Sequence, residues 1–93
     1  MEIAFKFKPK GASQEEITAE IVDVIAWEEQ YQKPITSVEN NPFVRDLVWL
    51  AWHAMKRSGR TSLDFMDWVA TLEDIEQTES VPLPPSENQV PIG

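Results

Sequence analysis

The N-terminal segment alternates apolar and polar side chains. Its apolar members are Ile3, Phe5 and Phe7. A period of two is typical of a strand that buries one face. Pro9 and Gly11 follow, and both residue types disfavour the continuation of a strand. We therefore expect a short N-terminal β-strand that ends at Pro9.

The next segment has the signals of a helix start. Ser13 and Glu16 have the spacing of a capping box, in which each side chain binds a free backbone N–H. Apolar residues follow at helical spacing, and Pro34 would end this first helix. The segment Glu15–Val22 also alternates, so a second strand that forms a hairpin with the first is the alternative. We rank the hairpin second. The expected apolar helix face consists of Ile17, Ile21, Val24, Ile25 and Tyr31.

A second helix is bounded by clear signals at both ends. Asn41 and Pro42 suit the N-cap and the first helical position. Gly59 tolerates positive φ, and the basic residues just before it complement the negative end of the helix dipole. The sequence therefore predicts a helix that ends near Ser58.

A third helix is expected after Thr61 or Ser62, either of which can cap it. Its apolar face would consist of Phe65, Trp68, Val69, Leu72 and Ile75. The helical pattern fades near Thr78. Carboxylates crowd this end, where they oppose the helix dipole, although a solvated acidic face is the commoner reason for such a cluster. These residues are Glu73, Asp74, Glu76 and Glu79.

The C-terminal segment has no apolar periodicity. Residues 81–93 hold four of the seven prolines and no basic residue, a composition typical of disorder. The 93 residues allow one domain. We expect a mainly α fold in residues 1–78, a small three-helix bundle with a short N-terminal β-strand or hairpin. A disordered, Pro-rich acidic tail would occupy residues 79–93.

The second helix also carries the candidate binding residues. Its apolar arc spans about 200°, whereas a surface helix usually shows an arc a little over 100° wide. Trp52 lies at one end of this arc, and Trp49 falls outside it among basic residues. Tryptophan and arginine are frequent where interfaces concentrate their binding energy. A Trp49 covered by the N-terminal strand is an equal alternative. The expected partner-binding residues are Trp49, Trp52, Arg45, His53, Lys56, Phe43 and Leu50.

Charge and composition exclude several classes of function. Eight basic against sixteen acidic residues give a formal charge of −8, which opposes binding to nucleic acid and to anionic membranes. No apolar stretch approaches the ~20 residues of a membrane span. The chain has no cysteine and one histidine, and no catalytic or metal-binding motif can be assembled from it. We expect a protein that binds another protein, with no enzymatic activity, metal or cofactor.

Residues in all three expected helices resemble a known family. The run from Asp46 to Gly59 resembles the central helix of tail assembly chaperones from long-tailed bacteriophages. The segment Asp23–Glu28 resembles their first helix, and the resemblance covers about Val22 to Glu76. The residues that resemble the third helix are Leu63-Asp64-Phe65, Trp68 and Leu72-Glu73-Asp74-Ile75-Glu76.

This resemblance implies a chaperone in the host cell cytoplasm, absent from the mature virion. It would keep the long, helical tape measure protein soluble until the tail tube polymerises around it. A frameshifted long form would recruit the tail tube protein, and many weakly bound copies could also self-associate. The alternative is a small phage or bacterial adaptor or inhibitor that binds one folded partner through the acidic face of the third helix.

Overall fold

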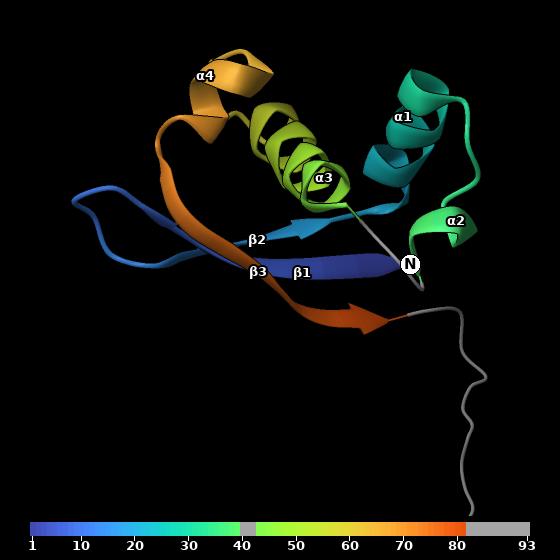
Figure 1. Ribbon diagram of the computed structural model, residues 1–93, viewed down its shortest axis with the longest axis horizontal. Helices are drawn as coiled ribbons and strands as arrows, with labels where there is room; N and C mark the ends of the chain where they lie inside the picture. Colours follow the sequence, from blue (N-terminus) through green and yellow to red (C-terminus); the bar gives the residue numbers. More distant parts are fainter. Residues whose placement is uncertain (40–42, 82–93) are drawn as a thin grey trace, which may run out of the picture.

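In the computed structural model, helices α1, α3 and α4 lie on one face of an antiparallel sheet (Figure 1). The structure describes the backbone of residues 1–39 and 43–81 and the side chains of residues 1–37 and 43–78. The strand order is β2-β1-β3, so the N-terminal strand is central. The strands are β1 (Glu2–Pro9), β2 (Glu15–Ala19) and β3 (Leu72–Val81). The helices are α1 (Ile21–Tyr31), α2 (Thr36–Glu39), α3 (Val44–Arg57) and α4 (Phe65–Val69).

The expected mainly α three-helix bundle is therefore wrong, because the described chain is a mixture of helix and sheet. The N-terminal strand was expected, and it is present. Two segments that were expected to be helical are strands instead. Both pair with β1, so contacts between residues distant in sequence override the local helical pattern.

The first of these strands, β2, forms the hairpin that we had ranked second. Ile17 lies opposite Phe5, and Ala19 lies opposite Ile3, so the apolar faces of both strands coincide. Ser13 lies in the turn and caps no helix. Helix α1 begins only at Ile21.

The second unexpected strand is β3, which replaces most of the expected third helix. The helical part is limited to α4, and β3 pairs with the other edge of β1. Glu76 lies opposite Lys6, and Asp74 lies opposite Lys8. The carboxylates that would oppose a helix dipole therefore lie beside lysines, which favours the strand. The strand continues to Val81, past the boundary expected at residue 78, and the expected tail beyond it lies outside the described residues.

The C-terminal end of α3 agrees with the prediction. Gly59 has a φ of 79°, and its N–H donates to the carbonyl of Lys56 at 3.1 Å. The N–H of Arg60 donates to the carbonyl of Met55 at 2.9 Å, which completes a Schellman motif. At the other end, the expected cap residues Asn41 and Pro42 lie outside the described residues.

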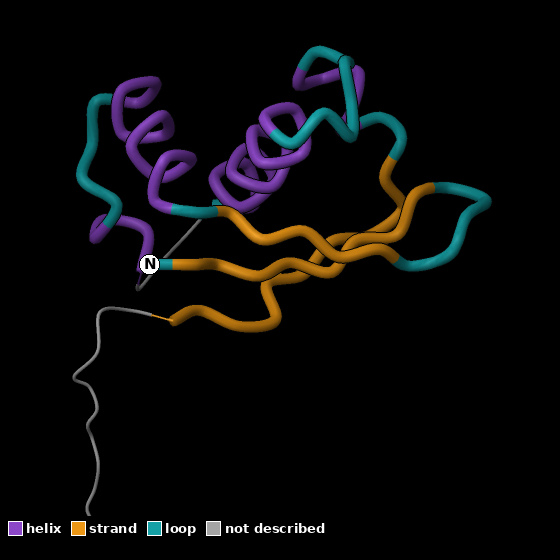
Figure 2. Tube along the Cα trace, turned by 180° about the vertical axis from the view of Figure 1, so that it is seen from behind, coloured by secondary structure: helices purple, strands orange, loops and turns teal. Residues whose placement is uncertain are grey.

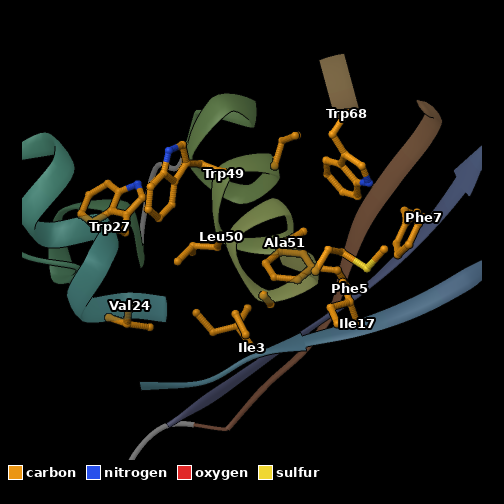
Figure 3. Close-up of a cluster of buried hydrophobic side chains, with 14 of the residues drawn as sticks. Ile3, Phe5, Phe7, Ile17, Val24, Trp27, Trp49, Leu50, Ala51 and Trp68 are labelled. Carbon is orange, nitrogen blue, oxygen red and sulfur yellow. The ribbon is translucent and has the colours of Figure 1, made fainter. Parts of the chain in front are cut away.

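The core fills the space between the sheet and the helices (Figure 3). Side chains from β1 and β2 face Leu50 and Ala51 of α3, and α1 contributes Trp27 to the same core. On α4, Trp68 packs edge-on against Phe7 with ring centroids 5.4 Å apart. No helix of the described residues covers the opposite face of the sheet (Figure 2). Buried residues of the strands are Ile3, Phe5, Phe7, Ile17 and Ala19.

Candidate functional site

A buried ion pair joins α1 to α3. The carboxylate of Asp23 is fully buried and accepts hydrogen bonds from Arg57 Nε at 3.0 Å and Arg57 Nη2 at 2.8 Å. His53 Nδ1 lies 2.6 Å from Asp23 Oδ1. The backbone N–H of Glu20 donates to Oδ2 at 2.8 Å. Every oxygen of this carboxylate therefore has partners, as a buried charge requires.

The contacts of Asp23 also determine its protonation. Burial alone would raise the pKa of Asp23, but the hydrogen bonds from Arg57, the Glu20 N–H and His53 together hold it below its ordinary value of 3.8. An ionised Asp23 beside a histidine supplies two of the three members of a catalytic triad. However, no hydroxyl group of the described side chains is hydrogen-bonded to His53. Within the part of the chain that the structure describes, the cluster connects two helices through the Asp23 carboxylate.

A second buried carboxylate, Asp46, repeats this connection at the start of α3. It accepts hydrogen bonds from the indole N–H of Trp27 at 3.3 Å and from the backbone N–H of Phe43 at 3.1 Å. Arg45 Nη2 lies 3.3 Å from the same carboxylate. Asp23 and Asp46 thus fix α1 against α3 at two points. Among the described residues, no group of three or more His, Cys, Asp or Glu side chains could hold a metal ion.

The apolar arc of the second helix predicts that Trp52 is buried and Trp49 exposed. In the structure, Trp49 is the more buried of the two. Trp49 is only 7% exposed, since its ring lies edge-on to Tyr31 of α1 and is stacked on His53. Trp52 is only half-buried. The reason is that α3 packs against both the sheet and α1, whereas the sequence prediction assumed that only one face of the helix is buried. Leu50, also among the expected binding residues, is 1% exposed and belongs to the core.

The remaining expected residues divide between the two ends of α3. At the N-terminal end, the Arg45 guanidinium lies 4.5 Å from the centre of the Tyr31 ring and 5.7 Å from that of Phe43. At the C-terminal end, Lys56 Nζ lies 5.3 Å from the centre of the Trp52 ring. Both cations thus rest on aromatic faces. The expected binding residues therefore form two separate surfaces, whereas the sequence predicted one.

We define the α3–α4 patch as the surface formed by Trp52, Lys56, Leu63, Phe65 and Met66. The indole N–H of Trp52 donates to the carbonyl of Leu63 at 2.9 Å, and its ring lies 5.6 Å from that of Phe65. Met66 is 67% exposed. Sequence reasoning missed Leu63 and Met66, because the binding residues were expected on the second helix and neither residue belongs to it.

The exposed large apolar residues share a location. Within the part of the chain whose side chains are described, all of them lie on α1, α3 and α4 or directly before α3 and α4. None lies on the sheet. Exposed apolar side chains gathered on one layer are typical of a protein-binding face. These residues are Ile21, Val22, Ile25, Phe43, Val44, Leu63 and Met66.

The acidic helical face expected for an adaptor or inhibitor is absent. Glu73, Asp74 and Glu76 lie on β3, and Lys8 Nζ lies 2.8 Å from Glu73 Oε1. Lysines of β1 lie opposite the other two carboxylates. These acidic groups are partly compensated within the chain.

Comparisons with protein-family models, with curated proteins and with solved structures found no match to this chain. Within the described residues, the helices are all too short or too polar to cross a lipid bilayer.

Proposed function

We propose that this protein is a phage tail assembly chaperone, which holds the tape measure protein in solution through the α3–α4 patch. The single observation that supports this is the exposed apolar surface of the patch. Leu63 and Met66 are exposed, and the Leu63 carbonyl accepts a hydrogen bond from the indole N–H of the half-buried Trp52. A monomer gains nothing in stability from such surface, whereas an apolar client would cover it.

The chemistry of the patch suits a client with many similar segments. Methionine is flexible and polarisable, so it adapts to differently shaped apolar partners. The patch is small, so each contact is weak, and the total affinity comes from many copies along one long chain. The Lys56 ammonium would pair with carboxylates at the edge of a client helix. These features favour a long amphipathic helix over one folded partner.

The charge of the protein is compatible with this role. The chain has a formal charge of −8, and Glu16, Asp74 and Glu76 place part of it on the sheet face away from the helices. Copies bound through their helices would surround the client with negative charge. Mutual repulsion between such complexes opposes aggregation. In the resemblance to tail assembly chaperones, residues 46–57 of α3 belong to the matching run. Of the residues that resemble a third helix, only Phe65 and Trp68 are helical.

The location and the further partner of this proposal follow from the resemblance. The chaperone would act in the host cell cytoplasm and would leave before the virion is complete. A frameshifted long form would bring the tail tube protein to the client. The adaptor or inhibitor alternative has lost the acidic helical face that motivated it, and no other observation favours it.

The test is co-expression with the very long helical protein encoded in the same genome. We expect wild-type chaperone to raise the soluble fraction of that client after centrifugation and to co-purify with it in many copies. Met66→Glu should abolish both effects, because it places a charge in the patch. The matched control is Gln14→Glu, which adds the same charge in the exposed hairpin turn.

Two results would contradict the proposal. The first is a client that is equally insoluble with and without the wild-type chaperone. The second is a Met66→Glu variant that keeps the wild-type melting temperature and still holds the client in solution. That result would show that the α3–α4 patch is not the binding surface.

A further inference from the structure

The two edges of the sheet differ in what covers them. On β2, Arg60 Nη1 donates to the Glu16 carbonyl at 2.9 Å, and Arg60 Nη2 donates to the Glu15 carboxylate at 3.0 Å. A side chain therefore occupies part of that edge. On the other side of the sheet, β3 pairs with β1, and no further strand of the described residues pairs with β3. An uncovered edge presents backbone N–H and C=O groups with which another extended chain can pair.

The register identifies which backbone groups of β3 face outward. In an antiparallel ladder, successive residues direct their backbone groups alternately toward one side of the strand and the other. Because the Glu16 carbonyl points away from β1, its partner Lys6 directs its own backbone groups away from β2. Lys6 therefore bonds to β3 at Glu76, which lies opposite it. The residues on either side of Glu76 consequently direct their backbone groups outward, and these residues are Ile75 and Gln77.

A hydrogen bond at Ile75 agrees with this assignment. The Ile75 N–H donates to Asp74 Oδ1 at 2.9 Å, so it is not used by the ladder with β1. The pairing with β1 is regular from Asp74 to Gln77, between two shifts in register. The N–H and C=O groups of Ile75 and Gln77 are therefore placed for a strand beside β3.

Rows of alternating charge cross the sheet face away from the helices (Figure 2) and end on β3. In the first row, Lys6 lies between Glu16 and Glu76. In the second row, Lys8 lies opposite Asp74. Both rows thus end on an exposed carboxylate at the uncovered edge. A cation at the next position, on a strand beside β3, would continue the alternation in each row.

The lysines of β1 do not neutralise these carboxylates fully. Lys6 is shared between two carboxylates, one on each neighbouring strand. Lys8 Nζ lies 2.8 Å from Glu73 Oε1, so it is shared between Glu73 and Asp74. The edge of β3 therefore keeps a negative charge. A second copy of β3 placed beside it would bring carboxylates together, whereas a strand with lysine or arginine would form favourable pairs.

We propose that β3 binds an extended basic segment of a partner protein by strand addition. The backbone of the partner pairs with Ile75 and Gln77, which supplies most of the affinity. Basic side chains at alternate positions of the partner lie beside Asp74 and Glu76. The residues between them lie beside the half-buried side chain of Ile75, where apolar side chains extend the core. The partner segment therefore alternates basic and apolar residues.

This interaction is separate from the α3–α4 patch. The patch would bind one face of a client helix, whereas β3 would bind a strand through its backbone. Neither Leu63 nor Met66 belongs to the edge of β3, so one copy of the protein has both surfaces available. The binding of a basic strand does not depend on the proposed client.

The probe is a synthetic peptide of alternating lysine and valine with blocked ends, about six residues long as in a typical strand. Calorimetry at low salt measures its binding to the full-length protein. The matched control is the same peptide with every backbone nitrogen methylated, which keeps the charge but cannot donate to a strand. We expect binding of the first peptide only. In amide NMR spectra, its addition should shift the signals of Ile75 and Gln77.

Two variants separate backbone pairing from charge. Gln77→Pro removes an outward N–H and obstructs the edge, and it should melt close to wild type because the ladder with β1 is retained. It should lose peptide binding. Asp74→Asn keeps an oxygen for the Ile75 N–H but loses the charge, so it should bind the peptide about two- to fivefold more weakly. Glu29→Gln removes one charge from an exposed position of α1 and should bind as wild type does.

Three results would overturn the proposal. The first is a wild-type protein that shows no binding of the alternating peptide at low salt. The second is equal binding of the methylated peptide, which would show that charge alone attracts it. The third is a folded Gln77→Pro variant that binds as wild type does. If Gln77→Pro does not fold, the methylated peptide and Asp74→Asn still decide. None of these measurements involves the tape measure protein, so failure here is distinguishable from failure of the proposed function.

Discussion

Arg57 at the end of α3 holds the buried carboxylate of Asp23 on α1 through two parallel hydrogen bonds of 3.0 and 2.8 Å. The guanidinium remains one-third exposed while the carboxylate is fully buried. This bidentate pair therefore neutralises the buried charge from the solvent side of the interface. It connects residues 34 positions apart, so no local sequence pattern predicts it.

Arg57→Ala should destabilise the protein by about 3 kcal/mol, because it leaves a buried carboxylate without its guanidinium partner. Urea unfolding monitored by tryptophan fluorescence would measure this loss. The matched control is Arg60→Ala, which removes a pair with Glu15 whose two side chains are 39% and 43% exposed. That change should cost less than about 1 kcal/mol. Equal losses in the two variants would contradict a special role for the Asp23 pair.

The same carboxylate should make stability depend on pH. The folded-state pKa of Asp23 is held below the ordinary value of 3.8, so its ionisation contributes stability above that pH. This contribution is lost as the pH falls through 3.8 toward the lower folded-state pKa. We expect the difference in unfolding free energy between wild type and Asp23→Asn to be largest near neutral pH and to shrink below pH 4. A difference that is constant with pH would show that the charge of Asp23 does not contribute.

Local patterns predicted the elements that are specified by nearby residues. The alternation of Ile3, Phe5 and Phe7 predicted β1, and Gly59 predicted the end of α3. Strand β2 was ambiguous for a physical reason, since Ile17 fits both a strand face and the first turn of a helix. The choice depends on pairing with β1, which a short local pattern does not encode.

Strand β3 and the exposures on α3 could not be read from local patterns at all. Leu72 and Ile75 have helical spacing, and only their position beside β1 makes them strand residues. Likewise, Trp49 would lie on the polar side of α3 if only the sheet covered that helix. It is buried because α3 also contacts α1. The patch residues Leu63 and Met66 were missed because the binding residues were expected on the second helix, and only the fold brings α4 beside it.

The two tryptophans of α3 should differ in their contribution to stability. Trp49→Ala removes a ring that is 7% exposed and should cost about 3 kcal/mol or more, since it leaves a cavity beside Tyr31. Trp52→Ala should cost roughly half as much, because the ring is partly exposed. Chemical denaturation of both variants measures this directly. A larger loss for Trp52→Ala would support the helical wheel over the structure.

The central row of charges on the open sheet face gives the last prediction. Lys6 on β1 lies between Glu16 on β2 and Glu76 on β3, each directly opposite it. Lys6→Glu would place three carboxylates in one row across the sheet. We expect a loss of about 1–2 kcal/mol, because two favourable cross-strand pairs become repulsive ones. Thermal unfolding measures the loss, and about 1 M NaCl should reduce it by screening.

The control for this row is Lys10→Glu, which makes the same change in charge just beyond β1, at an exposed position. It should cost distinctly less than Lys6→Glu. The comparison tests whether β3 pairs with β1 as well as whether the ion pairs contribute to stability. If residues 72–81 formed a helix away from β1, Lys6 would have no carboxylate on that side and the two variants would be alike. A clear excess loss in Lys6→Glu that salt reverses would support the view that the acidic residues of β3 select the strand through the lysines of β1.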